Sequence, residues 1–404
     1  MHSFFKLPFY PLLPDDPNLS LQRGRIHEFF KYTKPHRKLL EQIELVIIDE
    51  ISMVRADIID AIDRILRVYS HNLREPFGGK QLLLVGDVFQ LEPVVKNDER
   101  EILNRFYPTP YFFSARVFGQ IDLVSIELQK VYRQTDPVFV GVLDHIRNNT
   151  AGAADLQLLN TRYGSQIEES EADMYITLAT RRDTVDSINE KKLAELPGDP
   201  ITFEGVIEGD FPESSLPTSQ ELVLKPGAQI IFIKNDFDRR WVNGTIGVIA
   251  GIDEEEETIY VITDNGKECD VKRESWRNIR YRYNEKTKEI EEEVLGSFTQ
   301  YPIRLAWAIT VHKSQGLTFS RVVIDFTGGV FAGGQAYVAL SRCTSLDGIQ
   351  LKKPINRADV FVRPEIVNFA GRFNDRQAID KALKQAQADV QYAAASRAFD
   401  KGDM

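Results

Sequence analysis

The stretch LVIIDEISM (residues 45–53) decides the fold class, because four consecutive apolar residues end at a pair of acids. The stretch QLLLVGDVFQLEPV (residues 81–94) repeats the pattern, with Asp87 after its apolar run and Gln90 three residues later. Short, continuous apolar runs are typical of strands buried on both faces of a parallel sheet. We therefore predict that two parallel strands place Asp49, Glu50 and Asp87 at one sheet edge, where open α/β sheets bind ligands.

Further along the chain, YITLAT (175–180) and RVVIDF (321–326) repeat the short apolar run before polar residues. Helical patterns alternate with these runs, for example over residues 54–69, where apolar residues recur at helical spacing. Alternating strands and helices indicate an α/β fold.

Residues 199–300 have a different sequence pattern. Short β runs there are broken by Pro-Gly, Asn-Gly and Asp-Asn-Gly turns. This pattern predicts a small antiparallel barrel inserted into the α/β fold.

The composition excludes several classes of protein. The chain has 404 residues, of which 43% are hydrophobic and 27% charged, so disorder, collagen and disulfide scaffolds are excluded. The net charge of −10 argues against a protein that coats nucleic acid indiscriminately, although a basic channel on an acidic body is compatible with it. Two cysteines are typical of a reducing compartment, and no apolar run is long enough for a membrane helix. We expect a cytoplasmic protein.

The acids after the first strand suit phosphate chemistry. An aspartate at this edge can hold a Mg²⁺-bound water, and the adjacent glutamate can orient or deprotonate an attacking water. Gln90 could sense the γ-phosphate or that water. The alternative is a strand that happens to end in acids, but the two stretches together are more specific for phosphate chemistry than either stretch alone.

Two later motifs carry donors for phosphate oxygens. AWAITVHKSQGLTF (306–319) has a dense polar run, and such donors suit a nucleotide or a nucleic-acid backbone. The run comprises Thr310, His312, Lys313, Ser314, Gln315 and Gly316. Arg342 in LSRC and Arg133 in VYRQTDP are candidates for an arginine that stabilises a transferring phosphoryl group.

Together these motifs resemble those of the PIF/RecD-like branch of superfamily 1 helicases. The series DEISM, GDVFQL, YRQ, TR, TVHKSQGLTF and GGQAYVALSRCTS follows that family's order, and HSFF at residues 2–5 is similar to its motif Ia. The likeness extends to about residue 352. It implies two RecA-like motor domains with ATP between them, single-stranded DNA across their tops and 5′ to 3′ movement.

The resemblance also implies residue roles. Asp49 would bind Mg²⁺ through water, Glu50 would activate the hydrolytic water, and Gln90 would couple the γ-phosphate to motion. Arg133 and Arg342 would reach the γ-phosphate from the second motor domain, and Asp87, Gln315 and Gly316 would lie near ATP. The residues expected near DNA are Ser3, Thr180, Arg181, Thr310, His312, Lys313 and Ser314.

The same likeness predicts the domain organisation. The first motor domain, which is partial, spans residues 1–123 with a wedge-like excursion at 10–36. The second motor domain occupies 124–198 and 301–355, on either side of the inserted barrel at 199–300. Residues 356–404 form a helical tail.

One element of the family's pattern is absent from these 404 residues. A phosphate-binding loop of the form GxxxxGK[ST] would precede motif Ia, and FGGKQL (77–82) lacks its glycine spacing and its hydroxyl residue. It also leads into a strand, where a phosphate loop leads into a helix. The intact later motifs favour an N-terminally truncated sequence, and we expect the chain as written to be inactive, with unpaired strand edges in its first sheet.

Three functions are compatible with these features. The first is an ATP-dependent DNA helicase acting on single-stranded DNA or a fork, with replication or repair proteins as partners and a place in DNA repair or recombination. The second is a non-catalytic single-strand-binding remnant. The third is an ATPase of the same fold with another nucleic-acid substrate, including a relaxase-linked helicase. A nuclease is disfavoured because no metal-ligand cluster accompanies Asp49 and Glu50.

Overall fold

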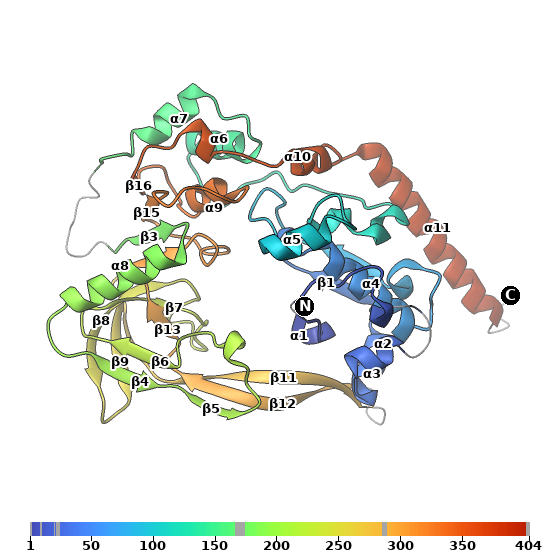
Figure 1. Ribbon diagram of the computed structural model, residues 1–404, viewed down its shortest axis with the longest axis horizontal. Helices are drawn as coiled ribbons and strands as arrows, with labels where there is room; N and C mark the ends of the chain where they lie inside the picture. Colours follow the sequence, from blue (N-terminus) through green and yellow to red (C-terminus); the bar gives the residue numbers. More distant parts are fainter. Residues whose placement is uncertain are drawn as a thin grey trace.

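The computed structural model describes residues 2–8, 10–19, 21, 25–165, 174–284 and 289–400. Figure 1 shows two α/β lobes, an antiparallel β region that reaches from one lobe towards the other, and a long helix at the C-terminal end. We call residues up to 123 the first lobe, and residues 124–198 with 301–355 the second lobe. Part of the predicted wedge, residues 20 and 22–24, lies outside the described residues.

The first lobe is built on two parallel strands, β1 and β2, which lie where the apolar runs predicted them. Their register pairs Leu45 with Gln81 and Ile48 with Leu84, so both carboxyl ends lie at one edge. The strands are β1 (Leu45–Ile48) and β2 (Gln81–Leu84), and the helices are α1 (His2–Phe5), α2 (Arg25–Phe30), α3 (Lys34–Gln42), α4 (Ala56–Tyr69) and α5 (Asn97–Leu103).

One prediction about these strands is wrong, because they are buried on one face only. Val46, Leu82 and Leu84 pack against the core of the lobe, whereas the alternate residues face outward. Ile47 is 60% exposed, and the neighbouring Leu45, Leu83 and Val85 are exposed as well. Among the described residues the sheet holds these two strands only, so its edges are open, as the sequence predicted.

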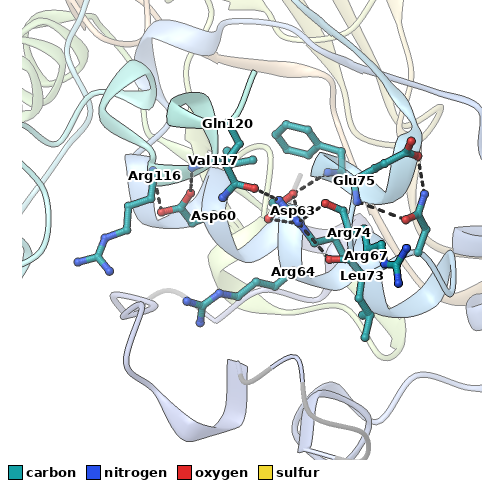
Figure 2. A network of polar contacts seen from close by, with 12 residues as sticks. Asp60, Asp63, Arg64, Arg67, Leu73, Arg74, Glu75, Arg116, Val117 and Gln120 are labelled. Carbon is teal, nitrogen blue, oxygen red and sulfur yellow. Dashed lines mark hydrogen bonds and ion pairs between the residues drawn. The ribbon is translucent and has the colours of Figure 1, made fainter. Parts of the chain in front are cut away.

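Helix α4 carries buried carboxylates as well as the expected apolar stripe. Asp63 accepts hydrogen bonds from Arg67 Nε (2.9 Å) and from the backbone N–H of Phe77 (2.6 Å). Arg67 in turn donates to Gln120 Oε1 (2.8 Å) and to the Leu73 carbonyl (3.2 Å), as Figure 2 shows. The helix therefore fixes the loop at residues 73–77 and the side chain of Gln120 through one buried ion pair.

Asp60, one turn earlier on α4, binds Tyr107 and the segment at residues 116–117. Its carboxylate accepts from the Tyr107 hydroxyl (2.9 Å) and from the backbone N–H groups of Arg116 (3.1 Å) and Val117 (3.0 Å). Figure 2 shows Asp60 with Arg116 and Val117 beside the Asp63 pair. Buried carboxylates are tolerated when their oxygens are satisfied in this way.

We predict that Asp60→Ala strongly destabilises the first lobe, because it leaves three donors unpaired. The expected loss is ~3 kcal/mol in the free energy of unfolding, measured by chemical denaturation. Asp122→Ala is the matched control, since that side chain is 86% exposed, and it should change the free energy little. Equal stability of the two variants would contradict this role for Asp60.

The second lobe contains a four-stranded parallel sheet, in agreement with the predicted α/β units. Its order is β14-β3-β15-β16, and β3 and β15 are buried along their whole length. The strands are β3 (Ile176–Ala179), β14 (Ala308–Thr310), β15 (Val322–Asp325) and β16 (Ile349–Leu351), and the helices are α6 (Pro137–Arg147), α7 (Ala153–Asn160), α8 (Arg182–Glu195) and α9 (Gln335–Ser341).

The β region after α8 is antiparallel, as its turns predicted. The described strands form a five-stranded sheet of order β10-β9-β8-β7-β13, a three-stranded sheet β11-β12-β5, and the pair β4-β6. Because β13 pairs with β7, this antiparallel region extends past its predicted end at residue 300. No pairing closes these described sheets into a ring, so the barrel stays a prediction. The bounds are β4 (Ile201–Glu204), β5 (Val206–Gly209), β6 (Glu221–Leu224), β7 (Gln229–Phe232), β8 (Ile246–Asp253), β9 (Thr258–Thr263), β10 (Glu268–Val271), β11 (Glu274–Asn284), β12 (Glu289–Gln300) and β13 (Ile303–Leu305).

Two features join the parts of the molecule. The long hairpin of β11 and β12 spans the lower side of Figure 1 and contacts α3 of the first lobe. The tail contains α10 (Pro364–Ala370) and α11 (Arg376–Asp400), and α10 packs its Phe369 ring on Phe113 of the first lobe, with centroids 4.4 Å apart. None of the described helices is long and apolar enough to cross a membrane.

Candidate ATPase cleft and nucleic-acid interface

The two strand ends of the first lobe bring three carboxylates together. Beyond the strands the pairing continues, because the N–H of Val85 donates to Ile48 O (2.8 Å) and that of Ile51 to Val85 O (3.0 Å). Gly86 makes this approach possible: its φ is +152°, and a Cβ there would lie 3.0 Å from the Ile51 nitrogen. Asp49 and Glu50 therefore lie beside the loop that carries Asp87.

Glu50 has a strained backbone. Its φ and ψ are 52° and 45°, the left-handed region that side chains other than glycine rarely adopt. The Glu50 N–H donates to Asp49 Oδ1 (2.8 Å), and both side chains are exposed. Such strain costs of order 1–3 kcal/mol and clusters at functional sites.

The second lobe supplies two guanidinium groups at the end of α9. Arg342 is 1% exposed, and it donates to Val338 O (2.9 Å), Ser341 Oγ (3.0 Å) and Leu317 O (3.3 Å). Arg133 donates to Ser341 O (3.1 Å). Burial and the neighbouring Arg133 lower the pKa of Arg342 to about 10, while Glu50 and Asp87 act in the opposite direction. Both carboxylates thus influence the Arg342 pKa, but the guanidinium donates its hydrogen bonds to acceptors of its own lobe.

The lobes touch directly at this cleft. Gln315 Nε2 donates to Glu50 Oε2 (2.7 Å) across 265 residues of sequence. The loop that carries Gln90 packs on the start of α9, where a Cβ on Gly334 would lie 2.3 Å from the Phe89 and Gln90 carbonyl oxygens. Gln90 Nε2 donates to Asp87 Oδ2 (3.4 Å). The structure therefore places Asp49, Glu50, Asp87 and Gln90 opposite the turn that carries Gln315 and Gly316.

Arg147 at the end of α6 is a site residue that the sequence reasoning missed. It donates to Asp87 Oδ1 (3.3 Å), pairs with Glu127 (2.8 Å) and lies over the Phe89 ring at 4.4 Å from its centroid. Burial and Asp87 together raise the pKa of Tyr337, which lies nearby on α9. The sequence offered no signal for Arg147 beyond a basic residue in the last turn of a helix.

The candidate DNA residues of the second lobe also gather at strand ends. Thr180 and Val311 follow adjacent strands, and Val311 N donates to Ala179 O (2.9 Å). The Thr180 hydroxyl is buried and without a partner in the described part of the chain. Arg181 is exposed and pairs with Asp183 (2.7 Å). Thr180, Arg181 and Val311 therefore lie together at the carboxyl ends of two adjacent parallel strands.

The turn after β14 holds the remaining candidates. The Thr310 hydroxyl accepts from the Lys313 N–H (3.2 Å), and Ser314 is fully buried with its hydroxyl donating to Val311 O (2.7 Å). Ser314 thus holds the turn together. Burial lowers the pKa of His312 and of Lys313, and the cations of Arg304 and Arg182 lower that of Lys313 further.

Arg304 on β13 precedes the TVHKSQG motif closely, and Arg182 at the start of α8 follows Arg181 directly, but the sequence reasoning named neither as a member of this basic group. Ser3 lies in α1, but its side chain is outside the part of the chain that the structure describes.

The FGGKQL segment is not a phosphate loop in the structure either. Lys80 leads into β2, and its Nζ donates to the carbonyl oxygens of Glu41 (2.9 Å) and Ile43. The ammonium group therefore fixes the end of α3. Among the described residues, no cluster of three His, Cys, Asp or Glu side chains could cage a metal. Mg²⁺ commonly binds through one or two carboxylates, water and phosphate oxygens, a mode that the exposed Asp49 fits.

Comparison with known proteins decides the family. A model of the PIF1-like helicases matches residues 1–146. The ATP-dependent DNA helicase Pif1 of Campylobacter jejuni is 34% identical over 367 residues, which cover 87% of this chain and 78% of the relative. The chain belongs to the PIF1-like helicase family. The human ATP-dependent DNA helicase PIF1 is also 34% identical, over 76% of this chain, but the chain spans 45% of its length.

Solved structures of PIF1-like helicases share the fold. Bacteroides Pif1 in complex with ADP-AlF4 superposes with a TM-score of 0.80 at 40% identity, covering 92% of this chain and 82% of that one. Bacteroides Pif1 bound to single-stranded DNA covers the same shares with a TM-score of 0.65 at 39% identity. The mixed α/β fold with parallel sheets is therefore that of the family's RecA-like motors, as the sequence predicted.

Proposed function

We propose that this chain is the motor core of an ATP-dependent DNA helicase that moves on single-stranded DNA. The observation that carries the proposal is the cleft in which Glu50 of the first lobe meets Gln315 of the second at 2.7 Å. A nucleotide bound there would lie between carboxylates from one lobe and guanidinium groups from the other, which is the arrangement that phosphoryl transfer requires. Relatives named ATP-dependent DNA helicases support the same function.

In this mechanism, the side chains of the cleft take distinct roles. Asp49 would hold Mg²⁺, and Glu50 accepts the proton of the attacking water. Gln90 senses the γ-phosphate, and Asp87 is held in place by Arg147. Arg342 and Arg133 stabilise charge on the transferred phosphoryl group after release from their carbonyl partners. Bound Mg²⁺ would neutralise phosphate charge.

The domain organisation is proposed on the same basis. Residues 1–123 and 124–198 with 301–355 form the two motor domains, residues 199–300 the inserted β-barrel, and residues 356–404 the tail. Movement in the 5′ to 3′ direction and action at forks follow from the resemblance. Cys269 and Cys343 are both free and buried, which supports a reducing compartment such as the cytoplasm.

DNA is expected to bind through its backbone, so Lys313→Ala should weaken binding similarly for all sequences. Loss of one phosphate contact should reduce the slope of log affinity against log salt by about 0.7 for a single strand. Fluorescence anisotropy with labelled oligonucleotides at several salt concentrations measures both effects. Lys384→Ala, on α11, is the control. An unchanged slope with Lys313→Ala would exclude Lys313 from the interface.

A second function, single-strand binding without hydrolysis, is favoured by one observation. The 404 residues contain no GxxxxGK[ST] loop, so the described cleft lacks backbone N–H groups and a lysine for the β- and γ-phosphates. ATP hydrolysis by this chain, with and without single-stranded DNA, separates the two functions. DNA-stimulated turnover supports the motor, whereas salt-sensitive DNA binding with background turnover supports the binding module.

A further inference from the structure

The segment 310–316 forms a rigid turn between the two candidate sites. Ser314 N donates to Thr310 O (3.1 Å), Gln315 N to His312 O (3.3 Å), and Leu317 N to Ser314 O (3.0 Å). The buried Ser314 hydroxyl adds its bond to Val311 O. A turn tied by so many internal bonds moves as one body, so a shift of one side chain is transmitted to the others.

The turn presents different chemistry to each site. His312 and Lys313 belong to the basic group that we assign to DNA, whereas Gln315 binds Glu50, the candidate general base. The amide orientation of Gln315 is fixed by its partner, because a carboxylate only accepts hydrogen bonds and so takes the NH₂ group. Gln315 Oε1 is buried without a partner in the described chain. In this arrangement the Gln315 Oε1 atom therefore lacks a hydrogen bond. This reduces the free-energy cost of moving the Gln315 side chain away from Glu50.

We propose that Gln315 is a positioning residue that couples DNA occupancy to the freedom of Glu50. The inference rests on the proposed function. In the arrangement described, the Gln315 amide holds the Glu50 carboxylate and withholds it from an attacking water. DNA bound to the turn shifts the turn and releases Glu50, so that hydrolysis depends on DNA. Coupling is reciprocal: if DNA breaks the Gln315–Glu50 bond, that bond opposes DNA binding.

The test is a double-mutant cycle on single-stranded DNA affinity, measured by fluorescence anisotropy with the full chain and without nucleotide. Gln315→Ala and Glu50→Ala should each tighten binding by about 3- to 10-fold, the net contribution of one solvent-exposed hydrogen bond. The double variant should bind no more tightly than the better single variant, because both remove one bond. Folding of each variant is checked by thermal unfolding.

A matched cycle separates hydrogen bonding from charge. Asp49 carries a carboxylate beside Glu50 and accepts the Glu50 N–H, whereas the Gln315 amide donates to Glu50. Its removal reduces repulsion of DNA without breaking the bond, so Asp49→Ala and Gln315→Ala should have additive effects. Additivity in the Glu50 cycle as well would overturn the inference alone. No DNA binding by the unmodified chain would overturn the proposed function together with the inference.

Discussion

Glu50→Gln is expected to lower ATP turnover by about 10³-fold, in the range of a lost general base. The measurement uses the chain with a GxxxxGKT strand–loop–helix element fused ahead of residue 1, which supplies the phosphate contacts absent from these 404 residues. Glutamine has the shape of glutamate and keeps the hydrogen-bonding oxygen, but it cannot accept the proton of the attacking water. Nucleotide affinity should therefore stay within about 2-fold, because the phosphates are held elsewhere.

Glu44→Gln provides the control for this prediction. Glu44 is an exposed acid just before β1, so its loss changes the charge by the same amount at a distance from the strand end. Its turnover should equal that of the unmodified chain. If Glu50→Gln retained full turnover, Glu50 would not be the base, and the neighbouring carboxylates would have to be tested in its place.

Arg342→Ala is expected to lower turnover by about 10³-fold or more, as loss of an arginine finger does. The structure makes the prediction specific, because Arg342 is buried next to Arg133 and close enough for Glu50 and Asp87 to shift its pKa. Its guanidinium can serve a phosphoryl group only by exchanging its carbonyl partners for phosphate oxygens. Arg342→Lys should lower turnover almost as much, since an ammonium group lacks the planar fork of donors.

Two further variants distinguish catalysis from folding. Arg342 is fully buried, so each variant is accompanied by a thermal unfolding measurement, and only a folded variant counts. Arg372→Ala removes an exposed arginine near the tail and should leave turnover unchanged. Near-normal turnover in folded Arg342→Ala, together with a large loss in Arg133→Ala, would assign the role to Arg133.

The sequence predicted the strands well because their signal is local. β1 coincides with LVII, and β2, β3 and β15 lie within a residue of their apolar runs. A continuous apolar run between turns has few other solutions in an α/β fold. The proximity of Asp49, Glu50 and Asp87 could also be predicted, because parallel strands share a carboxyl edge.

Other features depend on partners distant in sequence. The exposure of Ile47 depends on which other elements cover the sheet. The residue pattern of LVII contains no information about those elements. The helical pattern places Asp60 and Asp63 on the polar face of α4. Both are nevertheless buried, because backbone N–H groups at residues 77 and 116–117 donate to them. Arg147 and the Gln315–Glu50 bond arise where the two lobes meet, and the orientation of the lobes is set by packing.

Proximity of the two lobes at the cleft is tested most directly by cross-linking Glu50→Cys to Gln315→Cys. The native Cys269 and Cys343 are buried, so the introduced thiols are the accessible ones in the described chain. A short bifunctional thiol reagent should link residues 50 and 315 within one chain, identified by peptide mass spectrometry, and Glu50→Cys with Gln350→Cys should not link. If both introduced thiols react singly and no 50–315 link forms, the lobes do not share this cleft and the motor account is wrong.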